Sequence, residues 1–168
     1  MKTNAELFME MCTMQEQTDQ LIFKKTRMLA APSIENYILA VVDEIGELNH
    51  ELKPRWCWWK AQPGEVDWDR TLAELVDIWH FCISLMIHRT NVDPKEIVEV
   101  LDFERSALYC PVELLGNFAS GWVGKSNLLS SFNTLIGWGN SFGLDFPMIY
   151  EAYKTKNKEN NERAESDY

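Results

Sequence analysis

One apolar segment with a single polar stripe constrains the fold of this chain more than any other feature. The sequence from Leu72 to Ile87 is almost entirely apolar, which predicts a helix buried on nearly every side. Because carboxylates are costly to bury alone, the acids of this stripe must bind protons, basic side chains or a metal ion. At roughly 100° per residue, the polar residues fall within a sector of about 120°; they are Glu74, Asp77, His80, Ser84 and His88.

A second pair of carboxylates precedes this segment. Glu44 and Glu47 are three residues apart in a stretch whose apolar positions predict a helix from Ile34 to about Leu52, so both lie on one helix face. Taken alone, such a pair is typical of solvated helix surface. Two pairs on consecutive helices joined by a loop can instead face each other, which is one way a helical bundle builds a metal site. Carboxylate ligands without sulfur suit Mg²⁺ or Mn²⁺.

The remaining sequence reads as further helices joined by short loops, without an alternating strand pattern or an internal repeat. Capping residues and prolines predict helices that begin near residues 3, 34, 69, 94, 111 and 146, the last ending near Glu162. Six glycines leave the helix boundaries between residues 111 and 144 open. We expect an all-α helical bundle with a metal site between facing helices. It would form one domain over residues 1–168, with a mobile tail at 164–168.

The composition restricts the partners of the protein. The chain has 168 residues and a net charge of −10, and we expect no binding to nucleic acid because an acidic surface repels phosphates. The four cysteines form no CxxC pair, which favours reduced thiols and a cytoplasmic location. The N-terminus lacks the apolar core of a signal peptide, and polar residues interrupt the longest apolar stretch, so we expect no membrane partner.

Other side chains could serve a site at these carboxylates, although each also has a structural interpretation. His80 continues the acidic stripe and is by default a satisfied core histidine, with a substrate contact as the functional alternative. The tryptophan-rich loop at 56–60 could cover the core, or an aromatic ring beside its lysine could stack on a base and meet a phosphate. Lys156, Asn160 and Arg163 share a helix face, which is either a solvated helix end or a phosphate clamp.

The order of the four acids, ExxE followed by a spacer and ExxD, resembles the all-α NTP pyrophosphohydrolases (MazG-like), and within them the dimeric dUTPases. The chain departs from the closing motif of that family at Ala164 and Asp167, where the family usually has Gln and Gly. Further segments are similar to the family's motifs and follow in the same order: Met14–Asp19, Trp58–Lys60, Glu74–Phe81, and the terminal Lys156, Asn157, Asn160, Arg163 and Tyr168.

The resemblance implies hydrolysis of dUTP, and of dUDP, to dUMP by a metal-activated water, in a homodimer whose site can be completed across the interface. Glu47 would be the catalytic base. Two or three Mg²⁺ ions, with Mn²⁺ as a substitute, would be held by Glu44, Glu47, Glu74 and Asp77. The residues implied to bind the nucleotide are Gln15, Asp19, Trp59, Lys60, His80, Phe81, Lys156, Asn160, Arg163 and Tyr168.

Two alternatives remain open. A related all-α pyrophosphohydrolase for another nucleotide, such as dCTP or a non-standard NTP, would keep the four acids and differ at Gln15, Asp19 and the tryptophan loop. A non-enzymatic helical binding protein would use the acids only to pair with basic groups. The predicted helix around residues 69–89 has only Arg70 and Arg89, at its ends, and this lack of basic partners counts against the second alternative.

Overall fold

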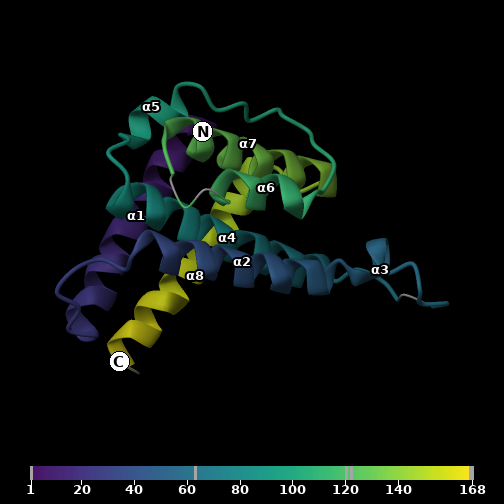
Figure 1. The fold of residues 1–168 in the computed structure, drawn as a ribbon, viewed down its shortest axis with the longest axis horizontal. Coiled ribbons are helices and arrows are strands. Elements are labelled where there is room, and N and C mark those ends of the chain that lie inside the picture. Colours follow the sequence, from purple (N-terminus) through teal and green to yellow (C-terminus); the bar gives the residue numbers. More distant parts are fainter. Residues whose placement is uncertain (1, 63, 120, 122, 167–168) are drawn as a thin grey trace.

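Eight helices and no strand make up the part of the chain that the computed structural model describes, which is residues 2–62, 64–119, 121 and 123–166 (Figure 1). The all-α prediction is therefore confirmed. The helices are α1 (Asn4–Lys25), α2 (Ile34–Glu51), α3 (Lys53–Trp56), α4 (Trp68–Arg89), α5 (Pro94–Val98), α6 (Pro111–Phe118), α7 (Lys125–Phe142) and α8 (Phe146–Ser166).

The central helix is α4, against which α1, α2, α7 and α8 all pack. Its Trp79 has no exposed surface and contacts the aromatic rings of Phe8, Phe132 and Phe146. Among the described helices, α4 alone is long and apolar enough to span a membrane, but 61% of its apolar window is buried inside the structure. Packing on nearly every side accounts for its composition.

Side-chain caps fix the first turns of α1, α4 and α8, and the sequence predicted those of α1 and α8 but not that of α4. Thr3 and Glu6 form the capping box of α1, and the Asp67 side chain caps α4. Asp145 accepts a hydrogen bond from the backbone N–H of Met148 at 2.9 Å and caps α8.

The last helix is longer than predicted, because α8 continues beyond Glu162 to Ser166. Ala164, which we assigned to a mobile tail, lies in this helix and is fully buried. The mobility of the tail stays a prediction, and its last two residues lie outside the described part of the chain.

Helices α2 and α4 lie side by side, and the segment that joins them lies at the far end of both, away from the other helices (Figure 1). We expected this segment to be a loop throughout, which is wrong for Lys53–Trp56, because these residues form the short helix α3. The rings of Trp58 and Trp59 are 88% and 58% exposed. These two rings therefore do not cover the core of their own chain.

The glycine-rich region that the sequence left open contains the buried helix α7. Gly137 lies where the backbone of Ala107 crosses this helix, and the Ala107 N–H donates to the Gly137 carbonyl at 3.2 Å. A Cβ atom at Gly137 would lie 2.7 Å from the Cβ of Ala107 and 3.1 Å from its backbone nitrogen. The glycine is therefore required by a close approach of backbone rather than by helix propensity.

We expect Gly137→Ala to lower the free energy of unfolding by about 1–3 kcal/mol, because the added methyl group forces two backbone segments apart. The matched control is Gly46→Ala in α2, where a new Cβ meets no atom within 4 Å. The control should stabilise the protein by about 0.5–1 kcal/mol, as alanine does at an unobstructed helix position. Urea unfolding measures both, and equal effects of the two substitutions would contradict the close approach.

Candidate active site

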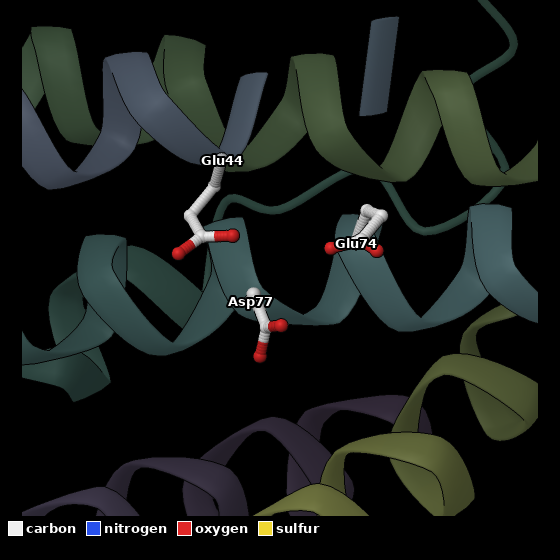
Figure 2. Close-up of side chains that lie close together, drawn as sticks. All are labelled: Glu44, Glu74 and Asp77. Carbon is white, nitrogen blue, oxygen red and sulfur yellow. The ribbon is translucent and has the colours of Figure 1, made fainter. Parts of the chain in front are cut away.

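Three carboxylates from two helices meet at one point. Glu44 extends from α2 toward Glu74 and Asp77 on α4 (Figure 2). One oxygen of each carboxylate lies within 4.8 Å of an oxygen of the other two. The two acidic pairs were predicted to face each other, and they do so for these three side chains. Their oxygens are close enough to ligate one cation.

Burial and mutual repulsion disfavour the charged forms of this carboxylate cluster. Burial, followed by the negative charge of Asp77, raises the pKa of Glu44 to about 7. Burial and then the charge of Glu47 raise the pKa of Glu74, and burial is also the main cause of the raised pKa of Asp77. The cluster therefore favours any bound species that carries positive charge.

Glu47, the fourth predicted ligand, lies beside this cluster rather than within it. Its side chain is exposed, and with Glu74 and Arg70 it lines a shallow groove on the outer side of α2 and α4. Its charge contributes to the raised pKa values of Glu44, Glu74 and Asp77. Its roles as metal ligand and catalytic base stay predictions.

The cluster has a basic partner that the sequence did not reveal. The Lys156 ammonium group, on α8, lies 2.5 Å from a carboxylate oxygen of Asp77, and both side chains are mostly buried. We expected the acids to lack basic partners because α4 carries arginines only at its ends. That expectation is wrong for Asp77, whose partner comes from a helix far away in the sequence.

A cavity of about 400 Å³ begins at this cluster and extends between α1, α4 and α8. This volume is within the range of small-molecule sites. Glu44 and Asp77 lie on its wall. Seven of the ten side chains predicted to bind the nucleotide also line it, namely Gln15, Asp19, His80, Phe81, Lys156, Asn160 and Arg163.

The other three predicted contacts are not brought to this cavity. Trp59 and Lys60 are exposed on the segment between α2 and α4 and do not line it. Tyr168 lies outside the described residues. Among the described residues of the chain, the cavity is therefore lined by α1, α2, α4 and α8, together with Pro32 just before α2.

Buried hydrogen-bonded side chains form the wall at the inner end of the cavity. His80 stacks on the Tyr153 ring with 3.9 Å between centroids, and its Nδ1 lies 2.6 Å from the Gln15 side-chain oxygen. Burial lowers the pKa of His80 to about 3, so the ring is neutral. Ser84 donates to Asp19 at 2.6 Å. His80 is thus a core histidine that also lines the cavity.

Sequence reasoning missed two tyrosines of this network. Tyr153 donates to the Gln15 oxygen at 2.6 Å, and the Tyr37 hydroxyl lies 3.1 Å from the Ser84 oxygen. Tyr153 lies one turn before Lys156 on the same helix face, which was an available signal. The sequence gives no such signal for Tyr37, because its position on α2 is that of an ordinary residue on the apolar face.

A helical domain that places carboxylates of two neighbouring helices at the edge of a cavity has the architecture of an all-α nucleotide pyrophosphohydrolase. The sequence matches the dUTPase family over residues 7–168, and the chain belongs to this all-helical family. It is therefore a dUTP diphosphatase, and the predicted hydrolysis of dUTP is confirmed. A comparison with curated proteins gives no match.

The raised pKa of Glu44 predicts how stability depends on pH without metal. The folded state binds the Glu44 proton more tightly than the unfolded chain, whose pKa is near 4.5, so the free energy of unfolding should fall as pH rises from 4.5 through about 7. Glu44→Gln removes this titration and should flatten the slope. Thermal unfolding in EDTA from pH 4.5 to 7 measures the slope of stability against pH. Equal slopes in the wild type and in Glu44→Gln would contradict the raised pKa of Glu44.

Proposed function

We propose that the protein hydrolyses dUTP, and also dUDP, to dUMP with Mg²⁺ bound by Glu44, Glu47, Glu74 and Asp77. The observation that carries this proposal is the cluster of Glu44, Glu74 and Asp77 at the mouth of the cavity. One oxygen of each carboxylate lies within 4.8 Å of an oxygen of the other two, and the pKa of Glu44 is raised. An all-oxygen ligand set fits a hard divalent ion. When bound, Mg²⁺ neutralises phosphate charge and acidifies the attacking water.

The side chains on the cavity wall divide it into two ends. Glu44, Asp77, Lys156 and Arg163 supply the charges of the outer end, which suits the phosphates, whereas Asp19 is buried at the inner end. Gln15 and the neutral His80 lie at the inner end, which suits a base, while Phe81 supplies a ring for packing. The exposed Glu47 is the carboxylate that accepts the proton of the attacking water.

Lys156 has two roles in this proposal. In the metal-free protein it pairs with Asp77 at 2.5 Å and compensates the cluster. Were Asp77 to hold Mg²⁺, the Lys156 ammonium group would be free to bind the phosphates together with Asn160 and Arg163, which line the same cavity. The lysine thus places a positive charge near the acids whether or not the ion is bound.

A homodimer explains the side chains that do not reach their own cavity. Trp59 and Lys60 lie on the projecting segment, and in the proposed dimer they reach the cavity of the partner chain, where they stack on the base and bind a phosphate. Exposed apolar side chains on this segment, on α2 and near α6 support an interface; they are Leu39, Val42, Trp58, Trp59, Leu108 and Val112.

We also place the enzyme in the cytoplasm, without nucleic-acid or membrane partners. The four cysteines are free, and three of them are buried, which fits a reducing compartment. The net charge of −10 disfavours contact with nucleic acid. A fluorescent fusion and a DNA-binding assay test these two statements.

Release of phosphate and pyrophosphate from dUTP, dUDP, dCTP, dTTP, dATP, dGTP and UTP tests the reaction. We expect turnover of dUTP and dUDP with Mg²⁺ and none with EDTA. Asp77→Asn should lower kcat by at least about a hundredfold, because an isosteric amide cannot replace an anionic ligand. Preferred turnover of dCTP would favour the sister activity, and full activity in EDTA would exclude the metal site.

Removing Lys156 should destabilise the protein only when metal is absent. Lys156→Met leaves Asp77 without its partner, and we expect a loss of about 1–3 kcal/mol in EDTA at neutral pH. Saturating Mg²⁺ should remove most of this difference, because the ion supplies the missing charge. The control is Lys154→Met, whose partner Glu151 is on the surface; it should change stability by less than about 1 kcal/mol. If Lys156→Met lowers the free energy of unfolding equally with and without Mg²⁺, the ion does not replace the charge of Lys156.

Mixing two inactive variants tests whether the site is shared. One chain carries Asp77→Asn, and the other carries Trp59→Ala with Lys60→Ala. If the projecting segment serves the partner, a heterodimer has one intact site, and random mixing should restore about a quarter of the wild-type activity. If the segment serves its own chain, no heterodimer has an intact site, and mixing restores nothing.

A further inference from the structure

A directed chain of hydrogen bonds lies behind the inner end of the cavity. His88 Nε2 lies 2.9 Å from one oxygen of Asp19, and the Gln15 amide nitrogen donates to the other oxygen at 2.8 Å. The Gln15 oxygen lies 2.6 Å from His80 Nδ1 and 2.6 Å from the Tyr153 hydroxyl. Each side-chain end of Gln15 is therefore held by a different set of partners.

Only one orientation of the Gln15 amide satisfies these partners. A carboxylate only accepts hydrogen bonds, so the NH₂ group of Gln15 must face Asp19. The amide oxygen then faces Tyr153 and His80, and both of these must donate to it. His80 therefore carries its proton on Nδ1, and its buried Nε2, which has no partner among the described residues, is an acceptor.

The Gln15 NH₂ group has a second N–H, and no described residue accepts a hydrogen bond from it. Gln15 itself lines the cavity, whereas His88 and Tyr153 are not among the side chains on its wall. His88 nevertheless holds the Asp19 carboxylate together with Ser84, and Tyr153 donates to the amide oxygen, so both contribute to the orientation of the amide. Neither can act on a bound molecule except through Gln15 and its neighbours.

We propose that His88 and Tyr153 are positioning residues that fix the Gln15 amide, so that the cavity presents an N–H donor to the base and selects a ring carbonyl over an amino group. The inference rests on the proposed function, which places the base at this end. A fixed N–H donates to the ring carbonyl of a 4-oxo pyrimidine, but it faces another donor in the amino group of a 4-amino pyrimidine. Rejection of the amino base then follows from the orientation of the amide.

The tautomer of His80 is the first test, because it requires no turnover. The ¹⁵N chemical shifts of the imidazole in the wild-type protein should show a neutral ring with its proton on Nδ1. Asp19→Asn can present either an oxygen or an NH₂ group to Gln15, so the amide is free to flip, and we expect both tautomers. A wild-type ring with its proton on Nε2 would overturn the proposal.

Base discrimination is the second test, measured as the ratio of kcat/KM for dUTP to that for dCTP. His88→Leu removes one of the donors to Asp19, and Tyr153→Phe removes a donor to the Gln15 oxygen; each should lower the ratio at least about tenfold. His88→Gln retains a donor and should restore most of the ratio. The control Tyr150→Phe lies one turn away on α8 and loses only a bond to Glu10, so its ratio should equal that of the wild type.

The outcomes separate this inference from the proposed function. An unchanged ratio in both His88→Leu and Tyr153→Phe, with dUTP still hydrolysed, overturns the positioning role alone. If Tyr150→Phe lowers the ratio as much as Tyr153→Phe does, the effect is one of general packing, and the positioning role is also overturned. A wild-type protein that turns over no dUTP refutes the proposed function, and the tautomer measurement still decides the amide orientation. If His88→Leu does not fold, the two tyrosine variants decide the test.

Discussion

The burial of carboxylates on a central helix is the constraint on which the rest of this structure depends. Four helices pack against α4, so the acids on its polar face cannot be fully solvated. Glu44 from α2 adds a third charge, and its pKa rises to about 7. The fold must therefore supply positive charge at this point. Lys156 of α8 supplies a positive charge there, and its ion pair with Asp77 ties the C-terminal helix to the site.

The polar face of α4 builds both ends of the cavity, because its character changes along the helix. Glu74 and Asp77 are partly exposed and acidic, whereas His80 and Ser84 are buried and hydrogen-bonded to α1. At 1.5 Å per residue, Asp77 and Ser84 are about 10 Å apart along the axis, and in the proposed function this span separates the phosphate end from the base end. One helix face thus sets the polarity and the length of the site.

Local patterns predicted the features that depend on local physics. Apolar periodicity and caps located α1, α2, α4 and α8, and the spacing of acids located the facing carboxylates. Contacts between distant segments were not predictable in this way. Lys156 and Asp77 are 79 residues apart in the sequence, and their pairing depends on how α8 is aligned against α4. The packing of α7 depends on Gly137, which leaves room for Ala107. Trp59 is exposed because its ring is not packed against the core of its own chain. No sequence pattern encodes such a lack of packing.

The active site and the stability of the fold make opposite demands on α4. A stable core would have amides or apolar groups at Glu44 and Asp77, because their repulsion favours the unfolded chain once they ionise. A cation site requires the charges to stay. Under the proposed function a flexible lysine meets both demands, because its long side chain can leave Asp77 without moving a helix. Since Lys156 also lines the cavity, the group that stabilises the metal-free fold is already in reach of the substrate.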